Sequence, residues 1–214
     1  MGKPKILVAG FGPFPGAPKN PSGQLAIALA NSRRIAATGA MVIGAVIPTT
    51  YQDVSAKFTN LLKIEKPDAV LMFGLAGAAP WIRVETRAAN FASSVFPDAG
   101  GGKNADGLLS PGAPQILKAR APIRQLLAAA RKAGVKASLS VNAGGYICNA
   151  AFFYCLEAAG KTGTPKLVAF VHIPWPRGRN RRRAGKQTVA PGFERLQSAA
   201  EAILLALIAA ARNS

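Results

Sequence analysis

The chain reads KILVAGFGPFPGAPKNPSGQLAIALA from Lys5 to Ala30. Residues 5–11 form a short apolar run that ends at a Gly/Pro-rich loop, which is typical of a buried first strand. After the loop, Pro21 and an expected N-cap at Ser22 precede apolar residues at helical spacing, so we expect a helix there. A buried strand that leads through a loop into a helix is the repeating unit of an α/β protein.

The rest of the chain repeats this alternation. We expect strands at residues 41–47, 69–73, 138–142 and 166–173, and helices at 51–65, 122–134, 147–159 and 193–212. Residues 74–107 are glycine-rich and irregular, as segments that carry sites often are. The order predicts an α/β fold, a three-layer α/β/α sandwich around a mostly parallel, mixed central sheet, with residues 1–214 as a single domain.

Composition argues against a disordered chain and against a membrane-spanning protein, and the cysteine count indicates the cellular compartment. Half of the 214 residues are hydrophobic and 17% are charged, which excludes a disordered chain. No apolar stretch reaches the roughly 18 to 20 residues that cross a bilayer, so no membrane partner is expected. Two cysteines, Cys148 and Cys155, are too few for a disulfide framework, so we expect free thiols and a cytoplasmic location.

The net charge of +18 raises nucleic acid as a possible partner. Part of this charge is concentrated between Arg177 and Lys186, where no acidic residue occurs, within a basic loop at about residues 176–190 that we expect to be flexible. The loop contains no aromatic residues on which bases could stack, which favours a solvated loop over a nucleic-acid site. Nucleic acid is therefore kept only as an alternative partner.

The sequence matches neither a dinucleotide-binding motif nor a zinc site. Gly10, Gly12 and Gly16 are spaced one residue too long for a dinucleotide fingerprint. The two cysteines lie seven residues apart on one expected helix, so their Cα atoms would be about 10.5 Å apart, too far to share a zinc ion. We expect no metal and no cofactor.

A thiol and an imidazole remain as candidates for chemistry. His172 is the only histidine, so a mechanism that needs an imidazole base must use it. Cys148 lies in the first turn of an expected helix, where free N–H groups and the helix dipole favour a thiolate. Either could be an ordinary core residue. Both, however, lie at the carboxyl ends of predicted strands that could be neighbours, at the sheet edge where α/β proteins place their sites.

A carboxylate that orients the imidazole would complete such an arrangement. Glu85 lies in the irregular segment between Arg83 and Arg87, and a surface ion pair with either arginine is the alternative for it. Cys155 lies among aromatic residues and is expected in the core.

Four blocks of sequence carry a resemblance to a known family. They are GFGPF (10–14) with NPS (20–22), GLAG (74–77) leading to Glu85 and Asn90, NAGGYICN (142–149), and VHIP (171–174). With these blocks the chain resembles pyroglutamyl peptidase I (pyrrolidone-carboxylate peptidase), a family of cysteine peptidases. The resemblance implies a catalytic triad of Glu85, Cys148 and His172. It also implies substrate-binding positions, each of which could equally be ordinary core: Phe11, Phe14, Thr49, Leu75, Phe96, Tyr146 and Ile147.

The activity implied by the resemblance is that of a cysteine exopeptidase that cleaves after an N-terminal pyroglutamate through a thioester acyl-enzyme. Pyroglutamyl peptides would be its substrates, and the family commonly forms homodimers or homotetramers. The alternative is a divergent, weakly active or inactive member that serves as a binding or scaffold protein. The resemblance aligns Val95 with a family arginine that helps the developing oxyanion, and Ala79 with a second arginine nearby. Losing such an oxyanion donor costs about 2.7 to 4 kcal/mol unless another group replaces it, so we expect an active enzyme whose turnover is slow or retuned.

Overall fold

The computed structural model describes residues 2–77, 79–95, 97–104, 107–177 and 190–214. Most of the expected basic loop, residues 178–189, and the expected substrate-binding residue Phe96 therefore lie outside the described residues. Within the described ranges, no helix is both long enough and apolar enough to span a bilayer.

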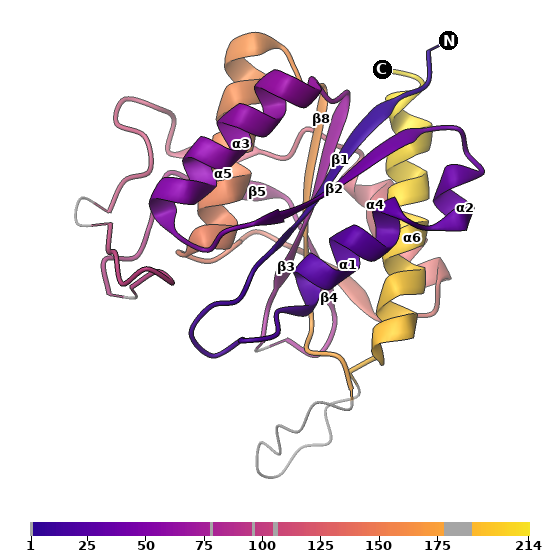
Figure 1. Cartoon of the computed structure of the whole chain (residues 1–214), viewed down its shortest axis with the longest axis horizontal. Helices are drawn as coiled ribbons and strands as arrows, with labels where there is room; N and C mark the ends of the chain where they lie inside the picture. Colours follow the sequence, from indigo (N-terminus) through magenta and orange to yellow (C-terminus); the bar gives the residue numbers. More distant parts are fainter. Residues whose placement is uncertain (1, 78, 96, 105–106, 178–189) are drawn as a thin grey trace.

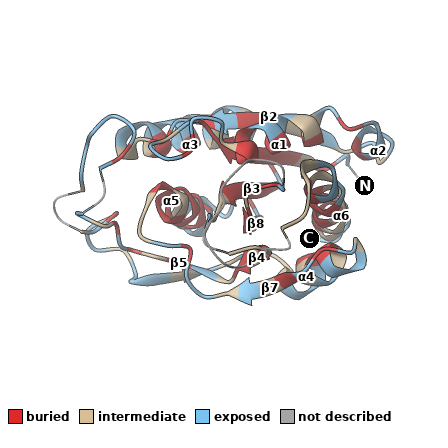
Figure 2. Ribbon diagram, turned by 90° about the horizontal axis from the view of Figure 1, so that it is seen from below, coloured by how far each residue is buried: buried red, intermediate tan, exposed pale blue. Residues whose placement is uncertain are grey.

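A six-stranded sheet runs through the centre of the described structure, with helices on both of its faces (Figures 1 and 2). In spatial order its strands are β2 (Met41–Ile47), β1 (Lys5–Phe11), β3 (Ala69–Leu75), β8 (Leu167–Ile173), β4 (Ile82–Glu85) and β7 (Ala137–Ser140). One face carries α1 (Pro21–Ala30), α2 (Arg33–Ala36), α4 (Ile123–Lys132) and α6 (Phe193–Ala211); the other carries α3 (Tyr51–Glu65) and α5 (Ile147–Thr162). The expected three-layer α/β/α fold is confirmed.

Strand direction makes the sheet mixed. β2, β1, β3 and β8 are parallel, β4 runs antiparallel to β8, and β7 runs parallel to β4. The central strands β1 and β3 are buried along nearly their whole length because helices cover both faces, which explains their continuous apolar sequences. The carboxyl ends of the four parallel strands consequently meet at one edge.

Two apolar cores fill the spaces between the sheet and the helices. Alternate residues of each strand point to opposite faces, so Val8 and Val171 pack toward α6 while Leu7 and Phe170 pack toward α5. Phe152 on α5 lies against Phe170, with ring centroids 5.5 Å apart. This packing fixes α5, and with it the start of the helix, against β8.

The segment expected to be irregular contains two strands that the sequence analysis missed. β4 joins the central sheet, and β5 (Arg87–Ala89) pairs with β6 (Ile116–Lys118) in a separate antiparallel ribbon. β4 has only four residues, IRVE, and two of them are charged, so its period-two pattern was too short to recognise. The strand matters because it ends at Glu85.

The N-cap of α1 also differs from the expectation. Asn20, rather than Ser22, is the capping residue, and its Oδ1 accepts the backbone N–H of Ser22 at 3.1 Å. Pro21 occupies the first helical position, so the cap lies two residues earlier than expected. The Ser22 hydroxyl instead accepts the N–H of Phe11 at 3.1 Å and fixes the end of β1 against the helix.

Candidate functional site

A pocket of about 220 Å³ lies where the parallel strands end. The carboxyl end of β1 contributes Phe11, that of β3 contributes Leu75, and that of β8 contributes His172. Six of the seven expected substrate-binding residues line the pocket together with Cys148 and His172: Phe11, Phe14, Thr49, Leu75, Tyr146 and Ile147. The pocket therefore brings together residues that are far apart in the sequence.

His172 and Glu85 are joined in the interior. Nδ1 of His172 lies 2.8 Å from Oε1 of Glu85, and the residues are 3% and 0% exposed. A carboxylate only accepts hydrogen bonds, so Nδ1 carries the proton and donates it. This tautomer leaves Nε2 of His172 free to accept a proton, as a general base requires.

The Cys148 sulfur lies beside this imidazole. Gly74 on β3 pairs in register with His172 on β8, so both residues address the same face of the sheet on strands about 4.8 Å apart. A Cβ atom added to Gly74 would lie only 2.8 Å from Sγ of Cys148. The sulfur thus occupies the space that the missing side chain of Gly74 leaves open, next to His172.

The elements that place Cys148 in the site differ from the expectation. We expected Cys148 and His172 to follow neighbouring strands, but β4 lies between β7 and β8, and β7 runs opposite to β8. Residues 141–146 instead connect the end of β7 to the start of α5, which carries Cys148 in its first turn. The unrecognised β4 is the reason for this error.

Burial overrides the helix dipole at the sulfur. The pKa of the Cys148 thiol is raised to about 12, chiefly by burial and then by the negative charge of Glu85; the charge of Arg83 and the backbone N–H of Cys148 act in the opposite direction. The effect of the helix start on this pKa, which the sequence led us to expect, is therefore outweighed by burial. Burial also lowers the pKa of His172, against the opposing effect of Glu85, so the resting pair is a neutral thiol beside a neutral imidazole.

Aromatic side chains form one wall of the pocket. The rings of Phe14 and Tyr146 lie 6.4 Å apart, and Tyr51 packs edge-on against Tyr146. The Tyr146 hydroxyl donates to the carbonyl of Pro97 at 3.1 Å. The ring of Tyr146 is therefore held in place on two sides.

Arg83 lines the same pocket, whereas its place in the sequence indicated only a possible surface ion pair with Glu85. An ion pair does join Nε of Arg83 to Oε1 of Glu85 at 3.7 Å, but Glu85 is fully buried rather than at the surface. Arg87 does not take part, because its Nε donates to the carbonyl of Val141. Residues two apart on a strand point to the same face, so β4 places Arg83 on the same face as Glu85. Without knowledge of β4 this placement could not be predicted.

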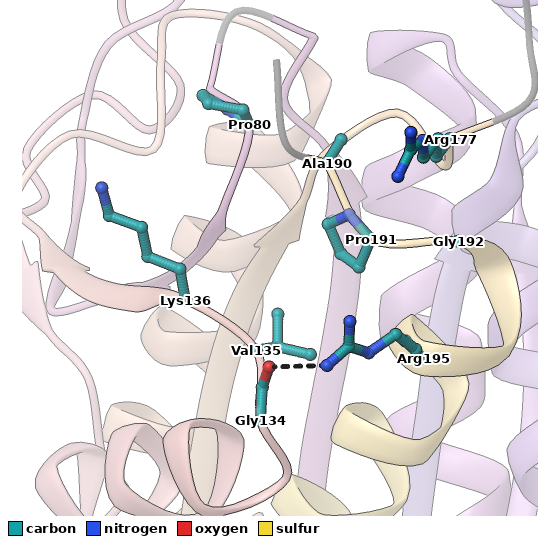
Figure 3. A pocket seen from close by; sticks show the side chains of 9 residues that line it. All are labelled: Pro80, Gly134, Val135, Lys136, Arg177, Ala190, Pro191, Gly192 and Arg195. Carbon is teal, nitrogen blue, oxygen red and sulfur yellow. Dashed lines mark hydrogen bonds between the residues drawn. The ribbon is translucent and has the colours of Figure 1, made fainter. Parts of the chain in front are cut away.

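A second cavity, of about 340 Å³, opens at the same edge, where β4 and β7 begin (Figure 3). Lys136 lies on one side of it and Arg177 and Arg195 on the other, with Arg195 directed at the carbonyl of Gly134 at 3.4 Å. The described residues that line it include no cysteine, histidine or carboxylate. The chemistry is therefore to be sought in the first pocket.

Cys155 has the structural position that was expected for it. It lies on α5 and is fully buried in the core between this helix and the sheet. Neither cysteine is in a disulfide. Of the two thiols, Cys148 lines the pocket and Cys155 lies in the core.

A thiol and an imidazole that line one pocket of an α/β/α protein, with a buried carboxylate bonded to the imidazole, are the side chains of a cysteine hydrolase. A family model described as pyroglutamyl peptidase matches residues 4–213, and the chain belongs to this family. It is similar to the pyrrolidone-carboxylate peptidases of Thermococcus kodakarensis, at 37% identity over 80% of this chain and 81% of the relative, and of Streptomyces coelicolor, at 33% over 80% and 78%. A solved pyrrolidone carboxyl peptidase from Thermococcus litoralis superposes with a TM-score of 0.90 at 29% identity, covering 98% of this chain and 96% of that one.

Proposed function

We propose that the chain hydrolyses the bond after an N-terminal pyroglutamate, and that Cys148, His172 and Glu85 carry the reaction. The single observation behind these roles is the buried 2.8 Å bond between Glu85 and His172, next to a sulfur seated over Gly74. The relatives are named pyrrolidone-carboxylate peptidases, which supports the same substrate.

The reaction begins with a neutral Cys148 thiol beside a neutral His172 imidazole. Nε2 of His172 accepts the proton of the Cys148 thiol while the sulfur attacks the pyroglutamyl carbonyl carbon. The imidazolium then gives this proton to the departing amine, and the C–N bond breaks to leave a thioester on Cys148. Water, deprotonated by His172, attacks the thioester and releases pyroglutamate and the thiol. Glu85 holds the ring and stabilises its charged form throughout.

The pocket suits a lactam because the pyroglutamyl ring is small, uncharged and largely apolar. Phe11 and Ile147 are buried at the pocket, and Phe14 and Tyr146 form its aromatic wall. Apolar walls with a few fixed polar groups are the usual way in which proteins hold such a ligand. We assign substrate binding to these residues together with Thr49 and Leu75, and keep Phe96 as an expectation from the sequence.

The oxyanion needs a donor that the side chain of Val95 cannot supply. The N-cap residue of α5, Tyr146, forms no side-chain cap, and Cys148 lies in the first turn of this helix. Free N–H groups at a helix start stabilise negative charge. We assign the backbone N–H groups at the start of α5 to this task.

Release of a fluorophore from a pyroglutamyl amide tests the function. We expect turnover by the wild type and its loss, by at least about 10³-fold, in Cys148→Ala and His172→Ala, because the remaining groups do not replace nucleophile or base. Cys155→Ala is the matched control and should keep its activity. A silent wild type with the correct fold would instead support the scaffold alternative.

We further propose that residues 1–214 act as one domain, that the protein is cytoplasmic, and that it assembles as a homodimer or homotetramer. The two free thiols support a reducing compartment. Assembly is supported by β2, which lies at an edge of the sheet and exposes Met41 and Val46. Light scattering on the purified chain would give its mass in solution, and a monomer would contradict the assembly.

A further inference from the structure

Three residues on neighbouring strands form a row across the sheet. Gly74 on β3 is in register with His172 on β8, and His172 is in register with Arg83 on β4. Directly opposite residues on paired strands point to the same face. Since Sγ of Cys148 fills the space over Gly74, the row consists of a thiol, an imidazole and a guanidinium.

Glu85 connects this guanidinium to the imidazole. Its Oε1 atom lies 2.8 Å from Nδ1 of His172 and 3.7 Å from Nε of Arg83. Within the described part of the chain, the buried side-chain nitrogen and oxygen atoms that have no hydrogen-bond partner are Nε of Arg83 and Oε2 of Glu85. Both belong to the same pair, so opposite charge rather than hydrogen bonding holds Arg83 here.

Arg83 also reaches the place where substrate would bind. Its side chain is 29% exposed and lines the pocket, although its Nε atom is buried. Around His172, β3 carries no ionisable side chain, the first turns of α5 carry Cys148, and β4 carries Arg83 and Glu85. Arg83 is the cation that acts on both members of the catalytic pair, and it lowers the pKa of each.

We propose that Arg83 is a positioning residue of this site: its guanidinium pairs with Glu85 and keeps a fixed positive charge beside His172 and Cys148, which stabilises the thiolate as it forms. The inference deepens the proposed function and rests on it. Burial and the Glu85 carboxylate both disfavour the Cys148 thiolate, and the positive charge of Arg83 offsets part of this effect.

Alkylation of Cys148 by iodoacetamide tests this role without relying on peptidase activity. Arg83→Met keeps the length of the side chain but removes its charge, and Arg83→Lys keeps the charge. At pH 8 we expect the Met variant to be alkylated about tenfold more slowly than wild type, because one pKa unit changes the thiolate fraction about tenfold. We expect the Lys variant to stay within about threefold. Peptide mass spectrometry separates Cys148 from Cys155, which is buried and serves as an internal reference.

Two further variants make the comparison secure. Arg124→Met removes the same charge from an exposed position on α4 and should leave the rate unchanged. Arg83→Gln is neutral and polar, and takes the place of the Met variant if that one does not fold. An alkylation rate in the neutral variant equal to that of wild type, or a Lys variant as slow as the neutral one, would overturn the proposal.

The pH profile of kcat/KM on a pyroglutamyl amide gives a second readout. Loss of a neighbouring cation raises the pKa of His172, which must be neutral to act as a base, so the acidic limb of Arg83→Met should move to higher pH. Arg83→Lys should keep the limb in place. If the wild type fails to turn over while the alkylation result holds, the proposed function is wrong and the charge effect of Arg83 stands.

Discussion

The Glu85 carboxylate determines which nitrogen of His172 carries the proton. It holds Nδ1 at 2.8 Å in a site where the carboxylate is fully buried. It also raises the pKa of the imidazole, against the larger effect of burial. Glu85 and Arg83 therefore act on His172 in opposite directions, and their variants should shift its titration in opposite directions.

Glu85→Gln tests the first of these effects. The amide can donate to the ring and so allow the wrong tautomer, and we expect kcat to fall by up to about 10⁴-fold. Because the carboxylate raises the pKa of His172, its loss should move the acidic limb of kcat/KM to lower pH. Steady-state kinetics on a pyroglutamyl amide over a range of pH measures both kcat and the position of the acidic limb. An unchanged kcat, or an acidic limb at higher pH, would contradict the role of Glu85.

Residue types alone identified Cys148 and His172 as candidates. The single histidine and the thiol at a helix start could be selected from the sequence, whereas Glu85 was selected by the family resemblance. The effect of burial on the pKa of Cys148 could not be predicted from the sequence, because it depends on how α5 packs on β3 and β8, which no local pattern shows. Arg83 was not assigned to the site for the same kind of reason, since its neighbours belong to other strands.

At the scale of elements, β3 and α5 approach each other closely at Gly74. A Cβ there would lie 2.8 Å from Sγ of Cys148 and 2.8 Å from the ring of Phe170. Both distances are too short for a real contact, so a side chain at this position must displace the sulfur or the ring. The glycine in β3 is therefore a condition for the geometry of the site.

Gly74→Ala should lower kcat by about 10²-fold or more, since a displacement of about 1 Å at a reacting group has an effect of this size. Gly160→Ala is the matched control, because a Cβ at Gly160 on α5 meets nothing within 4 Å. We expect that control to keep its activity. Circular dichroism should show both variants folded, and full activity in Gly74→Ala would mean that the sulfur does not depend on this space.

Long elements were predictable and short ones were not. β2 and α3 have the predicted bounds, because β2 is a continuous apolar run closed by Pro48 and α3 has helical spacing that ends shortly before Pro67. β4 was missed: four residues with two charges resemble a loop until the partner strands are known. Its antiparallel insertion also changed the order of the strands, which is why the route to Cys148 was predicted wrongly.

The whole molecule is strongly basic, and part of its charge lies at the catalytic edge. Lys136, Arg177 and Arg195 line the second cavity at the edge where β8 ends and β4 begins (Figure 3). A positive potential there would attract peptides with negative charge beyond the scissile bond.

We therefore expect pyroglutamyl dipeptides with an acidic second residue to be cleaved with a higher kcat/KM than neutral ones, by about three- to tenfold at low salt. The advantage should shrink as salt rises, because exposed charges are screened. Competition between the two dipeptides at several salt concentrations measures it. Equal rates at every ionic strength would reject this preference.

Capture of the acyl-enzyme tests the central claim most directly. Wild-type protein mixed with excess pyroglutamyl amide, quenched with acid within milliseconds and digested, can be mapped by mass spectrometry for a pyroglutamyl thioester. We predict the acyl group on the peptide that carries Cys148, and none on the peptide that carries Cys155. Turnover that persists in Cys148→Ala, or an acyl group found only at another residue, would contradict the mechanism.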